Sequence, residues 1–107
     1  MGTQGVVSVI ENDQVVMKII VGCNGDKASD VAFVVEDHWP ISMEEAYEIA
    51  QECGFYDRES LVVMTKNETK YLGDHDLDPR YRTTFNQPEF NPRWDQGTAD
   101  YVEVVKV

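Results

Sequence analysis

Three glutamates in the middle of the chain are spaced so that a helix would align their carboxylates. Glu44, Glu48 and Glu52 repeat every four residues, which places them in one row along a helix, about 6 Å apart. No lysine or arginine occurs between residues 28 and 57. A row of carboxylates without cations beside it repels nucleic acid and attracts a basic protein. The spacing therefore predicts electrostatic recognition rather than catalysis.

The segment before this row enlarges the negative surface if it is also helical, because it contains Asp30, Glu36 and Asp37. In one interpretation, the carboxylates take the positions of DNA phosphates in the groove of a basic host protein, such as a nucleic-acid-handling enzyme. In the other, they form the solvated side of an amphipathic helix. We use the name acidic face for the candidate partner-binding residues Asp30, Asp37, Glu44, Glu48 and Glu52.

Residues 79–94 have the opposite character, because arginines alternate there with aromatic residues. The candidate contact residues of this loop are Arg80, Arg82, Phe90 and Trp94. Arginine among aromatic side chains stacks on bases or anchors a protein interface. The net charge of −11 argues against direct nucleic-acid binding, which requires a larger basic footprint. We expect either a protein-contact loop or aromatics that cover an open sheet face while the arginines pair with carboxylates.

The chain offers little for metal chemistry. Residues 74–78 place three aspartates at alternate positions, as calcium-binding loops do, but Pro79 replaces the glycine that such a loop needs, and the glutamate is also absent. The two cysteines and two histidines do not have the spacing of a zinc site. We expect no metal and no cofactor. The four residues concerned are Cys23, Cys53, His38 and His75.

Candidates for catalysis are equally few. No serine or cysteine nucleophile motif and no nucleotide-binding fingerprint occurs in the sequence. A remote alternative is a small hydrolase, for example one that uses Thr3 as an N-terminal nucleophile after removal of the two preceding residues. We expect a protein that is not an enzyme.

The first elements that must position these residues are two β-branched runs, 6–10 and 14–22, which predict a hairpin. In the second run, Val15, Met17, Ile19 and Val21 should share one face. The other face, which includes Lys18, is also largely apolar. We therefore expect a central strand that is covered at least partly on both sides.

The clearest helix follows Ser42, which with Glu45 has the spacing of a capping box. This helix carries the glutamate row, and Gly54 supplies a left-handed stop. The segment 30–38 fits a helix capped by Ser29, but its β-branched residues also fit a strand. Pro40 ends either element.

The remaining runs 61–65, 69–72 and 101–107 predict strands. Residues 73–100 contain three prolines and resist assignment, apart from a short strand over 81–85. Segments of this length without regular structure are usually functional, partly structured or mobile. Together the pattern predicts an α+β fold: a mainly antiparallel sheet of four or five strands with one or two helices packed on one face.

The 107 residues are 42% hydrophobic, which suits one globular domain over 1–107. No apolar run reaches the length of a membrane span and no signal peptide opens the chain. We expect a cytoplasmic protein without membrane contact.

Short motifs at both ends of the chain carry a resemblance. The chain opens Met-Gly-Thr-Gln-Gly, has Asn24-Gly25 after the second strand, and has Ala-Asp-Tyr-Val at 99–102. It resembles short phage and bacterial proteins that open Met-Gly-Thr-Arg, place an Asp-Gly-Tyr-Pro-type turn after the second strand and finish in a tyrosine-containing strand. Here Gln4 replaces the arginine, and Asp-Lys replaces Tyr-Pro. The resemblance implies a phage or mobile-element origin and assigns no site.

These observations predict a small acidic binding module without catalytic activity, which engages a basic host protein through the acidic face. The alternative is a homo-oligomeric scaffold or accessory protein that uses the segment 85–94 or a sheet edge as its contact.

Overall fold

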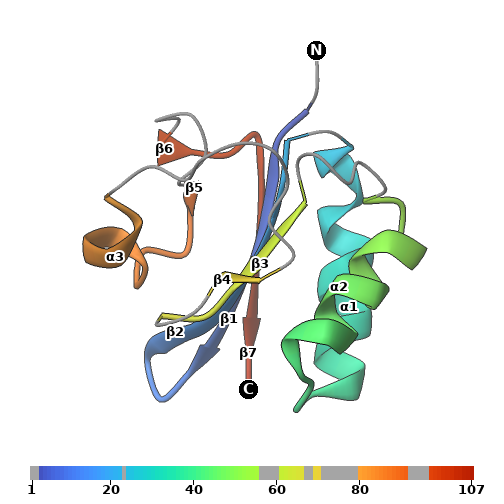
Figure 1. The fold of residues 1–107 in the computed structure, drawn as a ribbon, viewed down its shortest axis with the longest axis horizontal. Coiled ribbons are helices and arrows are strands. Elements are labelled where there is room, and N and C mark those ends of the chain that lie inside the picture. The colour runs from blue at the N-terminus through green and yellow to red at the C-terminus, as the bar shows by residue number, and fades with distance from the viewer. Residues whose placement is uncertain (1–2, 23, 56–60, 67–68, 71–79, 92–96) are drawn as a thin grey trace.

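The computed structural model describes residues 3–22, 24–55, 61–66, 69–70, 80–91 and 97–107. A mixed β-sheet lies between two layers (Figure 1). Two α-helices cover one face, and a short helix with a small two-stranded sheet lies on the other side. The α+β class expected from the sequence is confirmed.

The hairpin at the centre of the sheet is confirmed. Strands β1 (Gly5–Glu11) and β2 (Gln14–Val21) pair antiparallel. The two turn residues between them, Asn12 and Asp13, have φ angles of 53° and 64°. Asparagine and aspartate tolerate this left-handed conformation, which a tight hairpin turn requires. The turn chemistry of the sequence thus fixes the hairpin locally.

A β-bulge changes which side chains of β2 share a face. Val9 pairs with Met17, whereas Ile10 pairs with Val15, so Val16 is an extra residue that reverses the alternation. Val15 packs in the core on the far side from the two long helices, and Val16 packs with Met17. The expectation that Val15 and Met17 share a face is wrong for this reason.

The outer strands give the sheet the order β4-β3-β2-β1-β7. Strands β3 (Val62–Met64) and β4 (Thr69–Lys70) continue the sheet antiparallel beside β2. Strand β7 (Tyr101–Lys106) pairs with β1 in parallel. The sheet is therefore mixed, and the expectation of a mainly antiparallel sheet is wrong. Hydrophobic alternation marks a strand but does not encode its direction, which depends on the path of the chain before β7.

The two long helices cover one face of this sheet. Helix α1 (Ala28–His38) packs over β1 and β7, and α2 (Met43–Glu52) packs over β2 and β3. The segment 28–38 is thus a helix rather than a strand, and it ends before an extended Trp39, as Pro40 requires.

Helix α2 begins and ends at the residues that the sequence predicts. The N-cap of helix α1 differs from the predicted one. Ser42 Oγ accepts a 3.1 Å hydrogen bond from Glu45 N, and Glu45 Oε1 accepts one of 2.9 Å from Ser42 N. Gly54 has a φ of 112°. Ser29 is not the cap of α1, because the 3₁₀-helix η1 (Gly25–Lys27) leads directly into it and places the cap position at Lys27.

On the opposite face lie α3 (Tyr81–Thr84) and the two-stranded sheet of β5 (Phe90–Asn91) and β6 (Gly97–Thr98). The predicted strand over 81–85 is wrong: the hydroxyls of Thr83 and Thr84 both donate to the main-chain oxygen of Arg80 and close a helical turn. With α3 on the second face, the expectation of one or two helices on one face is also wrong. Residues 71–79 and 92–96 lie outside the described residues.

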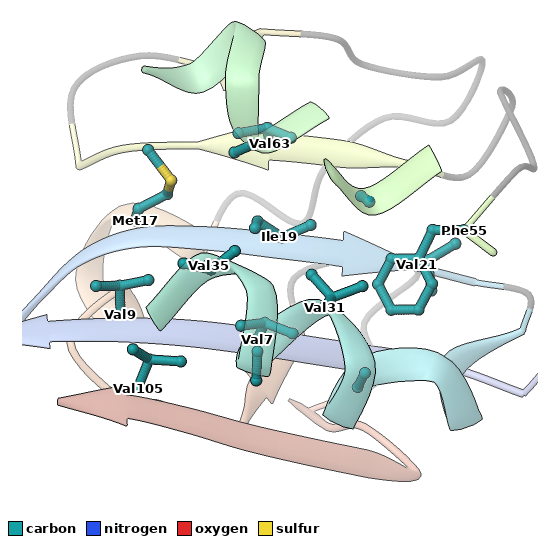
Figure 2. Close-up of a cluster of buried hydrophobic side chains, with 14 of the residues drawn as sticks. Val7, Val9, Met17, Ile19, Val21, Val31, Val35, Phe55, Val63 and Val105 are labelled. Carbon is teal, nitrogen blue, oxygen red and sulfur yellow. The ribbon is translucent and has the colours of Figure 1, made fainter. Parts of the chain in front are cut away.

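The sheet therefore has an apolar core on each side. In the helix-side core, valines of α1 pack on alternate residues of the strands (Figure 2). Its strand residues include Val7, Val9, Met17, Ile19, Val21, Val63 and Val105. The α3-side core consists of Val6, Val15, Ile20, Val62, Met64, Phe85 and Ala99. The expectation of a central strand covered on both faces is confirmed.

Candidate functional site

Helix α2 presents its glutamate row to solvent. Ala46 and Ala50 are buried against the sheet, while Glu44, Glu48 and Glu52 are exposed. Because the apolar stripe of α2 faces the helix-side core, the four-residue repeat necessarily points away from it. The row of carboxylates expected from the spacing is therefore a surface feature of the fold.

The segment before the glutamate row is also helical, and its acidic residues therefore enlarge the negative surface. Val31 and Val35 are fully buried, and Asp30, Glu36 and Asp37 are exposed. The helical period separates the two groups, since the buried residues recur at intervals of three and four.

The thiol of Cys53 shows that the acids of the two helices lie close together. Burial raises the pKa of the Cys53 thiol above its usual value, and the charges of Asp30 and Glu52 raise that pKa further. Asp30 belongs to α1 and Glu52 to α2, so both carboxylates lie within electrostatic range of one group. The acidic face thus extends across both helices.

Three carboxylates of the acidic face have no cationic partner in the part of the chain that the structure describes. Within the described parts of the chain, Asp30, Glu48 and Glu52 form no ion pair with a lysine or arginine. Asp37 Oδ2 lies 3.8 Å from Nδ1 of His38, and both side chains are largely exposed. An exposed pair of this kind is weak. Among the described residues, the carboxylates of Asp30, Glu48 and Glu52 therefore remain available to an external cation.

Phe33 is a further feature of the acidic face. Its side chain is 74% exposed on the outer side of α1, opposite the buried valines. On a helix, its neighbours at three and four positions are Asp30, Glu36 and Asp37. Sequence reasoning missed Phe33, because the apolar run 31–35 hides which residue leaves the helical stripe. Comparing its position with that stripe could have identified it.

The loop candidates are not assembled as one contact surface. Phe90 is buried, with 7% of its surface exposed, so the expectation that Phe90 contacts a partner is wrong. Its ring packs under the Arg80 guanidinium, 5.4 Å away. The exposed Arg82 lies 5.3 Å from the ring of Tyr81. Trp94 lies outside the described residues.

Polar groups of the central hairpin hold this loop against the sheet. Lys18 Nζ donates to the main-chain oxygens of Gln87 at 2.7 Å and Phe90 at 2.8 Å. Ser8, which pairs with Lys18 across the strands, donates from Oγ to the oxygen of Pro88 at 2.7 Å. The sequence left two expectations for 79–94, a protein-contact loop or aromatic residues that cover the sheet face. The buried rings of Phe85 and Phe90 agree with the second.

Burial of Lys18 alters its titration. The side chain is 1% exposed, and desolvation lowers the pKa of Lys18 from 10.5 to about 8, against the opposing effect of Glu89. The two aromatic rings of Phe85 and Phe90 lie 5.8 Å and 5.7 Å from Nζ and supply favourable cation–π contacts. This lysine acts as an anchor of the loop.

A cavity of about 150 Å³ lies where α3 meets the start of β2. The cationic side chains of Lys66 and Arg82 line this cavity, together with polar groups of α3 and its flanking residues. Its described lining includes no carboxylate, histidine or cysteine, so it supplies no argument for the hydrolase alternative. The described lining residues are Gln14, Val15, Lys66, Arg82, Thr83, Phe85 and Asn86.

The other candidates of the sequence give no site in the described residues. The aspartates of 74–78, with His75 and Cys23, lie outside them. Where the structure describes the chain, no three of its histidine, cysteine, aspartate and glutamate side chains are grouped so as to hold a metal ion. In the same residues, no helix has the length and apolar character needed to span a membrane.

Comparison with known proteins finds no protein-family model, no curated protein and no solved structure that matches this chain. The resemblance to short phage and bacterial proteins stays a prediction.

Proposed function

We propose that this chain is a non-catalytic binding module that engages a basic host protein through the acidic face. One observation carries the proposal: the exposed ring of Phe33 lies on a helix surface whose neighbouring positions are carboxylates. An amphipathic helix that needs only solubility gains nothing from an aromatic ring on its solvent side. An interface does, because an aromatic anchor inside a charged rim is the usual arrangement of a binding hot spot.

The charge of the face indicates the chemistry of the partner. Carboxylates on α1 and α2 steer a cationic surface toward the helices and repel nucleic acid. The ring of Phe33 then requires an apolar pocket on the partner in which to bind. The partner that fits is a protein with a shallow apolar pocket surrounded by lysines or arginines, as a nucleic-acid-handling protein presents when its nucleic-acid site is empty.

The test reverses charge on the acidic face without weakening the helices. Asp37→Lys, Glu48→Lys and Glu52→Lys are combined, because Asp37 and Glu52 lie in the last turns of α1 and α2, where a cation suits the helix dipole. The control combines Glu11→Lys, Asp26→Lys and Glu103→Lys, which change the net charge equally on other elements.

Each protein is immobilised and exposed to host lysate at about 50 mM and about 300 mM salt, where screening differs strongly. A captured basic protein is then purified and its dissociation constant measured. We expect binding that weakens with salt, is lost in the acidic-face variant and is kept in the control. Equal binding by both variants, or binding that salt leaves unchanged, would contradict the proposal. Circular dichroism checks that both variants fold.

A further inference from the structure

Strand β7 uses only one of its two edges within the described sheet. The N–H of Tyr101 donates a hydrogen bond to the main-chain oxygen of Gln4 at 3.1 Å. The N–H of Val107 donates one to the main-chain oxygen of Ile10 at 3.0 Å. The register between β7 and β1 has no shift along its length. In a regular parallel pair, the odd-numbered residues of β7 therefore point their main-chain groups toward β1.

The main-chain groups of Val102, Val104 and Lys106 consequently point to the opposite edge. No strand of the described residues pairs with that edge. Such an edge is a template for another strand unless proline, a bulge or a covering segment blocks it. Strand β7 contains no proline and no bulge in its pairing with β1.

The side chains at this edge are unusually apolar for a surface strand. Tyr101, Val104 and Val107 are 46%, 42% and 45% exposed. They are three of the four large hydrophobic side chains that the described surface exposes, and the fourth is Phe33 on α1. The open main-chain edge lies on β7, and the exposed apolar residues lie in this strand or directly after it, as a strand-pairing interface requires.

We propose that β7 pairs antiparallel with β7 of a second copy of this chain, about a two-fold axis at Val104. The two five-stranded sheets then join into one continuous sheet. A two-fold axis makes the interface self-complementary, because each copy offers the same edge to the other.

The outward main-chain groups and the charges select this register. With the axis at Val104, this residue and its copy exchange both hydrogen bonds, and Val102 faces Lys106 of the second copy. Tyr101 then faces Val107 of the second copy, so all three exposed apolar residues enter the interface. With the axis at Glu103, two carboxylates would face each other directly, which is unfavourable.

The net charge opposes this association. Each chain carries a formal charge of −11, so two copies repel each other at low salt and added salt screens the repulsion. Dimerisation should therefore strengthen with salt, whereas binding through the acidic face should weaken. The opposite salt dependences separate this inference from the proposed function, on which it does not rest.

The test measures sedimentation velocity of the purified protein from micromolar to millimolar concentration at low and high salt. We expect a monomer–dimer equilibrium whose dimer fraction rises with both. Val104→Lys places two ammonium groups against each other at the axis, so we expect dimerisation to weaken about tenfold or more. The control is Phe33→Lys, which also replaces an exposed apolar residue by lysine and should leave the dimer intact.

Amide hydrogen exchange of the wild-type protein provides a second readout that needs no variant. The N–H groups of Val102, Val104 and Lys106 should exchange more slowly as concentration rises, while those of Glu103 and Val105, already bonded to β1, should not change. A monomer under all conditions overturns the proposal. So does a dimer that Val104→Lys leaves unaffected, or one in which the three amides exchange equally fast at every concentration.

Discussion

The ammonium group of Lys18 donates a 2.8 Å hydrogen bond to the main-chain oxygen of Phe90, a residue 72 positions later in the chain. The same group donates to the oxygen of Gln87, so one side chain of the central hairpin holds both ends of a four-residue loop segment. The bond to Phe90 is buried and the bond to Gln87 is partly buried, and the rings of Phe85 and Phe90 lie beside the ammonium group. The α3 side of the sheet thus depends on a polar anchor as well as on apolar packing.

Lys18→Met should lower the free energy of unfolding by about 2 kcal/mol. Methionine keeps the unbranched stem but leaves the oxygens of Gln87 and Phe90 without their donor, and an unsatisfied buried carbonyl is costly. Urea denaturation measures the change. Lys106→Met removes an exposed lysine of β7 and should shift stability by no more than about 0.5 kcal/mol. Equal effects of the two substitutions would contradict the anchoring role of Lys18.

The free energy of unfolding should rise with pH between about 8 and 10.5, which are the folded pKa of Lys18 and its ordinary value. In this interval the folded protein has lost the Lys18 proton and the unfolded chain keeps it, so raising the pH favours folding, by at most about 3 kcal/mol. The neutral amine still donates two hydrogen bonds. Urea titrations at several pH values, compared with Lys18→Met, isolate this contribution. A wild-type profile parallel to that of Lys18→Met would contradict the shifted pKa.

Phe33→Ala should separate binding from stability. The ring is exposed, so the free energy of unfolding should change by less than about 0.5 kcal/mol. If Phe33 anchors the basic partner, the dissociation constant should rise about tenfold or more. Tyr101→Ala removes another exposed aromatic ring, from β7 rather than the acidic face, and should leave partner affinity unchanged. Calorimetric titration with the purified partner measures both variants.

Labelling of Cys53 tests whether the acids of the two helices converge. In a Cys23→Ser background, Asp30→Asn and Glu52→Gln should each lower the pKa of the Cys53 thiol, since both carboxylates raise it. More thiolate then reacts with a disulfide reagent at a given pH. Asp37→Asn is the matched control and should not change the rate. If Asp37→Asn raised the labelling rate of Cys53 as much as Asp30→Asn does, the result would indicate only a general effect of charge and would contradict the convergence of the two helices' acids.

Features encoded by neighbouring residues could be predicted from the sequence. The hairpin follows from β-branched runs on either side of Asn12 and Asp13, and α2 follows from the reciprocal bonds of Ser42 and Glu45. The exposure of the glutamate row follows from the helical period once Ala46 and Ala50 are buried. Each of these involves residues close in the sequence, and the widest hairpin pair, Gly5 with Val21, is 16 residues apart.

Features that depend on distant contacts were predicted wrongly or missed. Phe90 was expected at the surface, but it is buried and Lys18, 72 residues earlier in the chain, lies beside its ring. The bulge at Val16 is set by pairing with β1, which the sequence of β2 does not reveal. The exposure of Phe33 required the orientation of α1 on the sheet.

The sequence by itself determined the α+β class, the central hairpin and the capped helix with its glutamate row, because hydrogen bonds and helical periodicity act over a few residues. Only the tertiary structure decided that β7 runs parallel to β1, that Lys18 is buried beneath the loop, and that Asp30 and Glu52 lie near the same thiol. These relationships join residues far apart in the chain. They are set by how the packed layers exclude water, which no local pattern specifies.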